Sequence, residues 1–255
     1  MTSKVVFIFR RDLRLQDNPA FTRAVKYCRE IDAQFMPCFF FTRNQITPRH
    51  NEYYSANAVA FLLECLEELD DDLHEAGFGH LHVFELTGEE PPAEACPHLP
   101  FPHHDIKGVF FNRDTTPYAL RRDATRPDDP TIGEGYLLLD SVHILKTGAG
   151  KPYQVFTPFY NKASIMNIPN PISAPRGALN HLPLNRDLPS LTDLIKKYTP
   201  PSSHPVNKDM KGGRRAALRQ LEHVHGGGFS NYITTRDAPA NERGTTRMSQ
   251  YLKFG

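Results

Sequence analysis

The chain has 255 residues, of which 39% are hydrophobic and 23% are charged, and its formal net charge is +1 at pH 7. This length allows one large domain or two ordinary ones with a buried core, while the 22 prolines indicate that much of the chain is loop. No apolar run approaches the roughly 18 residues that cross a bilayer, and the apolar start of the chain is too short for a signal peptide, so we expect no membrane partner and an intracellular location in the cytoplasm or nucleus.

The first predicted elements form a strand–helix–strand unit. The apolar run at 5–9, VVFIF, predicts a strand that is buried on both faces. Asn18 and Pro19 provide an N-cap and a proline at the first helical position, and the helix continues to Cys28. A second apolar run at 35–41 predicts the next strand. Two strands joined through a helix in this way lie parallel.

The longest predicted helix covers 53–76, where apolar residues recur at helical spacing until Gly77 provides a stop. Its opposite face is acidic, and we expect that face to be solvated; it carries Glu64, Glu67, Glu68, Asp70, Asp71 and Asp72. Later strands are predicted at 80–86, 107–112 and 135–140.

These elements predict an α/β fold with a Rossmann-like, doubly wound parallel sheet of five strands. Ligands of such sheets usually lie beyond the carboxyl ends of the strands. Two crossovers, at 89–105 and 124–135, occupy places where helices are expected, yet prolines interrupt both segments.

The second half of the chain predicts a different organisation. Eight prolines between 167 and 205 predict an extended interdomain linker. Ala216, Leu218, Leu221 and Val224 then predict an amphipathic helix over 212–224. The resulting division is an α/β domain, a linker and the start of an incomplete all-α domain, at 1–166, 167–207 and 208–255.

The last of these segments is basic. Residues 208–255 contain nine Lys/Arg and four Asp/Glu, a net charge of +5. This charge favours a solvated helix face over a nucleic-acid site when it is taken alone.

Two charged loops follow predicted strands. RRDLRLQDN (10–18) contains Asp12, and FFNRDTTPYALRRD (110–123) contains Asp114 before a helix that opens at Pro117. Both aspartates are expected at carboxyl ends of strands. An ion-pair network that fixes the loops is the favoured interpretation, and a ligand site at the sheet edge is the alternative. No GxGxxG motif follows the first strand, so the dinucleotide fingerprint is absent.

Metal and nucleophile chemistry are not predicted. The twelve histidines lack carboxylate or cysteine partners at zinc spacing, and no Ser-His-Asp order is present. The cysteines have no CxxC pair, so we expect free thiols at Cys28, Cys38, Cys65 and Cys96. The catalytic residues stay unknown at this stage.

The tail contains a possible anion site. Thr245, Thr246 and Ser249 precede a helix-like stretch, beside Arg247. Free backbone amides at a helix start, together with these hydroxyls, suit a pyrophosphate. A plain capped helix is the alternative, and it is favoured on physical grounds alone.

Five segments in collinear order resemble the photolyase/cryptochrome family. They are FRRDLRLQDNP (9–19), FNRDTTPYALRRD (111–123), GKPYQVFTPFYNKA (150–163), GGRRAALRQL (212–221) and NYITTRDAPANERGTTRMSQYLKFG (231–255). The resemblance implies FAD contacts at Tyr232, Thr245, Thr246, Arg247, Met248 and Ser249. It also implies a DNA contact at Arg236, and an antenna chromophore of the deazaflavin type near Asp12, Asp114 and Lys253. Thr116 stands where folate-using members carry a glutamate, so a folate antenna is less favoured.

The activity implied by the resemblance is that of a deoxyribodipyrimidine photolyase, which repairs pyrimidine dimers in damaged DNA with light and FAD. The flavin domain of the family continues well beyond the motif at 244–255, and this chain contains no Trp. We therefore expect the N-terminal portion of such an enzyme, which needs a companion chain or its missing C-terminal half. The alternatives are a fragment of a cryptochrome-like blue-light photoreceptor, and a non-enzymatic α/β binding module or degraded remnant.

Overall fold

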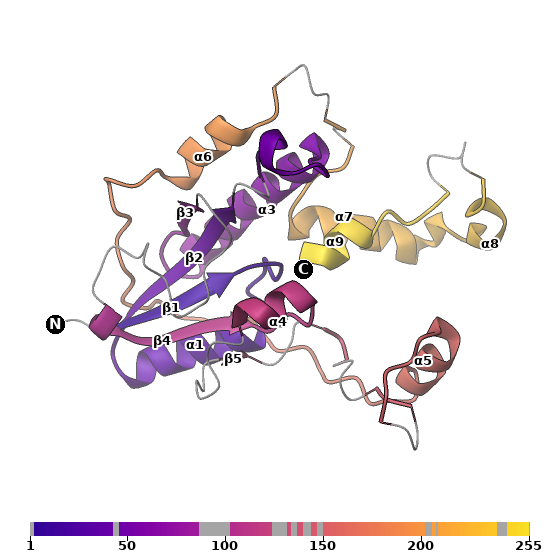
Figure 1. The fold of residues 1–255 in the computed structure, drawn as a ribbon, viewed down its shortest axis with the longest axis horizontal. Helices are drawn as coiled ribbons and strands as arrows, with labels where there is room; N and C mark the ends of the chain where they lie inside the picture. Colours follow the sequence, from indigo (N-terminus) through magenta and orange to yellow (C-terminus); the bar gives the residue numbers. More distant parts are fainter. Residues whose placement is uncertain are drawn as a thin grey trace.

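A parallel sheet lies at the centre of the computed structural model of the protein (Figure 1). Its strand order is β3-β2-β1-β4-β5, and the order reverses between β1 and β4, as in a Rossmann-like sheet. The strands are β1 (Lys4–Phe9), β2 (Gln34–Thr42), β3 (His82–Leu86), β4 (Ile106–Asn112) and β5 (Ile132–Gly133). The structure describes residues 3–42, 46–86, 103–123, 132–133, 137–139, 144–146, 150–201, 206–207, 209–238 and 244–254.

Local signals set the ends of the first helices, and the predicted cap at Asn18 and stop at Gly77 are confirmed, whereas α3 starts three residues later than predicted. Asn18 caps α1 (Pro19–Glu30) by accepting from the Phe21 backbone N–H at 3.0 Å. Ser55 caps α3 (Ala56–Glu75), and Gly77 follows it with a φ of 80°, in the left-handed region that favours glycine. After β4, the short helix α4 (Pro117–Asp123) begins at its proline.

The sheet is buried on both faces, which explains why its strands are continuous apolar runs. Val5, Phe7 and Phe9 point toward α1 and α3, where the rings of Phe7 and Phe21 meet edge to face at 5.2 Å. Alternate residues of the same strand, Val6 and Ile8, lie in a second apolar cluster on the other face. Partly buried residues packed against that second cluster are Ile106, Leu182 and Leu188.

The fifth strand was predicted at the wrong place. The described residues of the apolar run at 135–140, 137–139, form a bend, and Leu138 is 69% exposed. The strand that extends the sheet is the two-residue β5, which pairs with the end of β4. A short apolar run forms a strand only if other parts of the chain bury it, and the residues that would bury it are distant in the sequence. Of the two interrupted crossovers, 89–102, 124–131 and 134–135 lie outside the described residues.

Residues 167–190, predicted as part of a linker, contain no helix, and they pack against the sheet and the end of α3. The Leu179 N–H donates to the Gly77 carbonyl at 3.0 Å, and the Leu182 N–H donates to the Phe35 carbonyl at 2.9 Å. The prediction missed the helix α6 (Leu191–Tyr198). A capping box between Ser190 and Asp193 starts this helix. It escaped notice because it has eight residues and lies in a proline-rich stretch.

The remaining helices of the described chain are short. They are the 3-10 turns η1 (Pro48–His50) and η2 (His103–Asp105), α5 (Phe156–Ala163), α7 (Arg214–His223), a π turn (Val224–Gly228), α8 (Tyr232–Thr235) and α9 (Ser249–Phe254). In Figure 1, α9 lies beside the end of β1, whereas α5 and α8 stand away from the sheet. None of the helices described here is long and apolar enough to cross a membrane.

Candidate functional site

Asp12 lies just beyond the carboxyl end of β1, where it is 2% exposed. The Arg10 backbone N–H donates to its Oδ1 at 3.1 Å, and the amides of Asn18 and Asn112 donate to its Oδ2 at 3.2 and 2.5 Å. The Asn112 amide also donates to Asn18 Oδ1 at 2.7 Å. A buried carboxylate needs such donors. The network therefore fixes the loop after β1 to the start of α1 and the end of β4.

Asp114 occupies the equivalent place after β4, the strand beside β1, and is 8% exposed. Its Oδ1 accepts from the Thr116 N–H at 2.9 Å, and its Oδ2 forms an ion pair with Arg11 at 3.4 Å. The two predicted aspartates thus lie at neighbouring strand ends, as expected. Both are engaged with protein donors, but only Asp114 forms the kind of ion pair that the favoured interpretation expected, whereas Asp12 accepts from amide groups.

A second buried ion pair ties α4 to the same loop. The Arg10 guanidinium donates to both carboxylate oxygens of Asp123 at 3.0 and 3.1 Å, and that of Arg122 does so at 2.9 and 3.0 Å. All three side chains are about nine-tenths buried. Burial favours a raised pKa for Asp123, but the hydrogen bond from Arg122 and the charge of Arg10 outweigh it and hold the pKa below its usual range.

The acidic face of α3 is only partly solvated: Glu67 and Asp71 are exposed as predicted, whereas the residues that follow contact the tail. Glu64 accepts from Lys211 Nζ at 2.8 Å and from the Gly212 N–H at 2.6 Å. Glu68 accepts from the Arg215 N–H at 2.8 Å. The first N–H groups of a helix lack partners within the helix and carry a partial positive charge. Glu68 therefore caps the N-terminus of α7, and Glu64 holds the residues just before it.

Two further contacts complete this junction. Arg215 forms an ion pair with Asp72 at 3.1 Å, and the Gly213 N–H donates to Cys65 Sγ at 3.1 Å. Gly213 has a φ of 91°, and a Cβ at this position would collide with the Glu68 carboxylate. The basic charge of the tail is thus partly used to hold α7 on the α/β domain.

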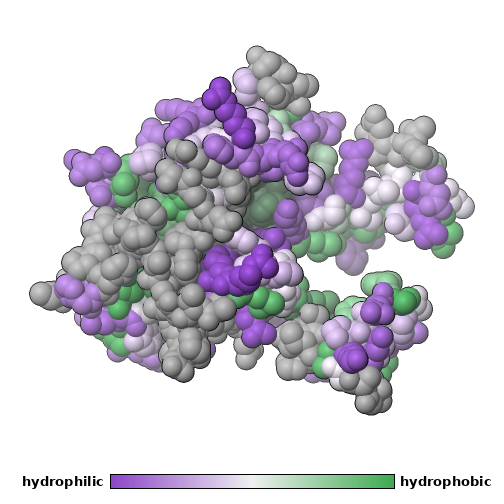
Figure 2. Space-filling view, viewed as in Figure 1, coloured by the Kyte–Doolittle hydropathy of each residue, from purple (hydrophilic) through white to green (hydrophobic). Residues whose placement is uncertain are grey.

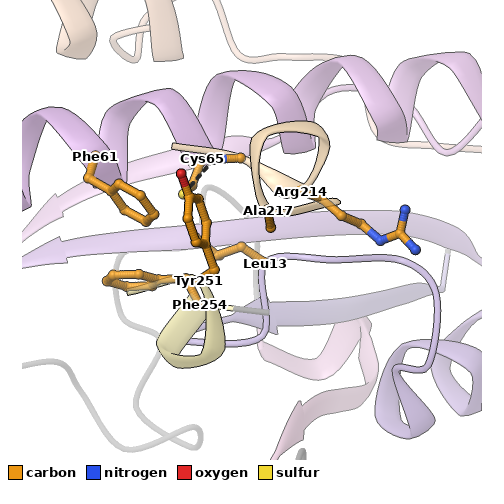
Figure 3. Close-up of a pocket in the computed structure, with 8 residues that line it drawn as sticks. Leu13, Phe61, Cys65, Arg214, Ala217, Tyr251 and Phe254 are labelled. Atoms are coloured by element: carbon orange, nitrogen blue, oxygen red, sulfur yellow. Dashed lines mark hydrogen bonds between the residues drawn. The ribbon is translucent and has the colours of Figure 1, made fainter. Parts of the chain in front are cut away.

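The other end of the tail is also docked on this domain (Figure 3). The Leu13 N–H donates to the Phe254 carbonyl at 2.8 Å, which joins the loop after β1 to α9. The rings of Tyr251 and Phe254 lie 5.4 and 5.9 Å from that of Phe61 on α3. The cavity between these side chains has a volume of about 10 Å³, room for about one water and for no chromophore.

The cysteines found in the described part are free and buried, as predicted: they are Cys28, Cys38 and Cys65. Burial raises the pKa of Cys65 to about 12, even though the Gly213 N–H lowers it, and burial raises the pKa of Cys28 to about 11. Such thiols are not nucleophiles at neutral pH. Cys96 lies outside the described residues. Within the described segments, no group of three or more His, Cys, Asp or Glu is arranged to hold a metal ion.

The residues predicted for a phosphate site lie between α8 and α9. Thr245 and Ser249 are exposed, and Thr246 and Arg247 are half-buried. The Thr246 carbonyl accepts from the Gln220 side chain at 2.8 Å, which anchors the turn to α7. Arg247 adopts a φ of 50°. Met248 is half-buried, and its carbonyl accepts the first hydrogen bond of α9, from Leu252 at 2.9 Å.

The other predicted residues of the tail are exposed. Tyr232 begins α8 and is 41% exposed. Arg236 follows that helix, and its Nε donates to Asp237 at 3.3 Å while its side chain stays 54% exposed. Lys253 lies on α9 with its Nζ 5.5 Å from the ring centroid of Phe254. The structure therefore brings Lys253 near the loop after β1 but leaves Tyr232 and Arg236 on a separate surface.

Sequence reasoning missed the docking residues Glu64, Glu68 and Asp72, whose partners are about 140 residues away along the chain. A signal was present, because an acidic helix face and a basic tail have complementary charge. The sequence alone did not show that the acidic helix face and the basic tail are in contact.

Comparisons with known proteins agree with this arrangement. The family model described as DNA photolyase matches residues 5–176. A deoxyribodipyrimidine photo-lyase from Synechococcus sp. is 28% identical over 267 residues, which cover 100% of this chain and 52% of that protein. Cryptochrome-1 of Mus musculus is 26% identical over 274 residues, which cover 100% of this chain and 43% of its own length.

A solved structure is also similar. An archaeal photolyase from Sulfolobus tokodaii has a TM-score of 0.70 and 26% identity to this chain, and the match covers 99% of this chain and 52% of that one. The chain thus spans about half the length of these relatives.

Proposed function

The chain belongs to the DNA photolyase family, and from that premise we propose that it is the N-terminal portion of a flavoprotein that repairs pyrimidine dimers in DNA with light. The observation that carries the proposal is the extent of the match, which runs through the whole chain but only about half of the photolyase relatives. We accordingly assign an antenna domain to 1–166, a linker to 167–207 and the start of a FAD-binding domain to 208–255.

The residues present fit the phosphate part of FAD and little more. The hydroxyls of Thr245 and Thr246 bond to no other described residue, so they are available to phosphate oxygens beside Arg247. Met248, Ser249 and Tyr232 complete this proposed edge. Bound flavin would supply the electron that splits the dimer. Because the described residues supply only this edge, we propose that a further helical segment, either on this protein or on a companion polypeptide, supplies the other walls of the site.

An antenna chromophore is a second proposed ligand. The Sulfolobus tokodaii photolyase is described with two FAD molecules and with the implication of a novel light-harvesting cofactor. For this chain we propose a deazaflavin-type molecule near Asp12, Asp114 and Lys253. The proposal is supported by the adjacency of β1 and β4 and by the bond between Leu13 and Phe254. In this arrangement Asp12 positions the loop rather than contacts the chromophore, because its oxygens accept from Arg10, Asn18 and Asn112.

Damaged DNA is the proposed substrate, and Arg236 is the proposed contact. Its side chain is 54% exposed, and that of its partner Asp237 is 81% exposed, so the pair is weak and a phosphate can compete for it. Contacts of this kind position a protein on DNA without reading its sequence.

A cryptochrome-like photoreceptor is the second candidate. It is favoured by Cryptochrome-1 of Mus musculus, which matches the whole chain at 26% identity, close to the 28% of the photolyase. In that case the complex would bind flavin and change its affinity for a partner in light, without repair.

The test is co-expression of the full chain with the C-terminal half of the Synechococcus photolyase. We expect co-purified FAD and loss of thymine dimers from an oligonucleotide in blue light. Thr245→Ala/Thr246→Ala should weaken FAD binding about tenfold. The control Thr234→Ala, whose hydroxyl donates to the Asn231 carbonyl at the start of α8, should change it less than twofold. Flavin without repair would favour the photoreceptor, and neither flavin nor repair would overturn both proposals.

A further inference from the structure

A cavity of about 280 Å³ lies at the edge of the sheet, between β3 and the segment that leads into α6 (Figure 1). Residues 81–84 line one side of it, and 184–186 and 188–190 line the other, together with Asp193 of α6. Its volume is close to the roughly 300 Å³ at which pockets for small ligands begin. Because β2 separates β3 from β1, the cavity is distinct from the strand ends where the antenna site is proposed.

The wall of this cavity is mostly apolar, as in typical ligand pockets. Its apolar side chains are Leu81, Val83, Phe84, Leu184, Leu188 and Pro189. Those from the sheet side are at most 5% exposed and therefore fixed, whereas Leu184 is 42% exposed. In Figure 2 the region of α6 and the segment before it, at the upper left, shows hydrophobic patches between hydrophilic side chains. A ligand with an apolar body would gain free energy by covering Leu184.

His82 supplies a buried hydrogen-bond acceptor to the cavity. It is 3% exposed, and its Nε2 lies 3.2 Å from the Leu182 carbonyl, which can only accept, so Nε2 carries the proton and Nδ1 has a free lone pair. Burial lowers the pKa of His82, although the bond to that carbonyl raises it, so the ring is neutral at pH 7.

The Nδ1 atom of His82 bonds to no other described residue. In the described part of the chain, the polar side-chain atoms that are fully enclosed without a partner are Thr22 Oγ1 and Gln250 Nε2. Because Nδ1 is not among them, it is reached from outside the protein, and the cavity that His82 lines provides the access. A donor group of a ligand can therefore bond to Nδ1.

Arg186 supplies a cation to the same cavity. Its side chain is exposed and bonds to no other described residue. The one carboxylate in the lining, that of Asp193, is already bonded, because the N–H and the hydroxyl of Ser190 donate to its Oδ2 at 3.0 and 2.6 Å. A guanidinium matches the geometry of a carboxylate and can bind it through two parallel hydrogen bonds. Arg186 is therefore available to a ligand carboxylate.

We propose that this cavity binds a small aromatic carboxylic acid that also carries an O–H or N–H donor. The carboxylate pairs with Arg186, the donor bonds to His82 Nδ1, and the ring packs between Phe84 and Leu184. Such a ligand contacts β3 and the segment 184–190 at once, so its binding holds this segment on the sheet. The inference is independent of the proposed repair activity, since it uses none of the residues assigned to FAD, the antenna or DNA.

Titration calorimetry of the full chain with para-hydroxyphenylacetate tests the proposal. We expect saturable one-to-one binding with a Kd of about 1 mM or lower, as suits so small a ligand. Phenylacetate lacks the hydroxyl for His82, and para-hydroxyphenylacetamide lacks the charge for Arg186. Each should bind at least about fivefold more weakly. This ligand series uses the wild-type chain alone, so it does not depend on the folding of any variant.

Arg186→Gln should raise the Kd of para-hydroxyphenylacetate about tenfold and leave that of para-hydroxyphenylacetamide unchanged. The matched control is Arg176→Gln, because Arg176 is also exposed in the segment 167–190 but does not line this cavity, and it should change the Kd by less than about twofold. Both variants should keep the wild-type thermal midpoint, because the substituted side chains are exposed. In the wild-type chain, para-hydroxyphenylacetate should slow hydrogen exchange in 182–190 and leave α1 unchanged.

Three results would overturn the inference. The first is the lack of saturable binding of para-hydroxyphenylacetate up to about 10 mM. The second is an equal Kd for phenylacetate, which would show that His82 Nδ1 does not recognise a donor. The third is an equal Kd in Arg186→Gln, or slower exchange in α1 rather than in 182–190, which would place the bound acid elsewhere.

Discussion

Asp123→Asn should destabilise the protein because it removes the charge that two buried guanidiniums share. Arg10 and Arg122 make four hydrogen bonds to this carboxylate at 2.9 to 3.1 Å, and all three side chains are about nine-tenths buried. Breaking a buried pair from one side costs 3–5 kcal/mol in typical cases. Since Asn keeps one acceptor, we expect a loss of about 3 kcal/mol in the free energy of unfolding at pH 7.

The effect should depend on pH in a defined direction. The folded-state pKa of Asp123 is lowered, so it lies below the unfolded value of about 3.9. The ionised carboxylate therefore stabilises the folded state above that pH, and the contribution is lost as pH falls through the folded-state pKa. The difference between wild type and variant should thus be full at pH 7 and shrink below about pH 4.

Urea unfolding followed by circular dichroism measures this difference, which suits a chain without Trp. Asp237→Asn is the matched control, because the same kind of Arg–Asp pair is exposed there, and it should cost less than about 1 kcal/mol. A loss below about 1 kcal/mol in Asp123→Asn, or a loss that does not shrink in acid, would refute the reasoning.

Three further predictions concern the junctions of the fold. Asn112→Ala should lower the free energy of unfolding by about 2–3 kcal/mol in urea, because the buried Asp12 carboxylate loses a donor; a change below about 0.5 kcal/mol would contradict the network. Glu68→Ala should raise hydrogen exchange in 212–223 and leave β1 and β2 unchanged by mass spectrometry; unchanged exchange in 212–223 would show that α3 does not hold α7. Cys28 and Cys65, with pKa values of about 11 and 12, should resist iodoacetamide at pH 8 in the native protein and react in urea; native labelling of either would contradict their burial.

The sheet was largely predictable because its signals are local. Strands buried on both faces appear as apolar runs, and Asn18, Pro19 and Gly77 mark helix ends through their own backbone preferences. The prediction of the fifth strand at 135–140 was wrong because the sequence of that run does not show whether other residues pack over it. The helix α6 was missed because a short capped helix between prolines has too few turns for a periodic pattern.

The site was predictable in place but not in role. The order of strands put Asp12 and Asp114 at one edge of the sheet, and the structure confirms that placement. It also shows that the Asp12 carboxylate fixes the loop after β1 to the N-terminus of α1. This role depends on a hydrogen bond from Asn112, which lies 100 residues later in the chain. Glu64 and Glu68 gave no local sign of their role, since they accept from the backbone N–H of Gly212, just before α7, and from that of Arg215, in its first turn.

Light-dependent repair by the reconstituted complex tests the central claim most directly. The full chain, co-expressed with the C-terminal half of the Synechococcus photolyase, is mixed with an oligonucleotide that contains one thymine dimer and is illuminated with blue light. We predict loss of the dimer in light, no loss in darkness and none from either half alone. A flavin-containing complex that leaves the dimer intact in light would contradict the claim that this chain is part of a repair enzyme.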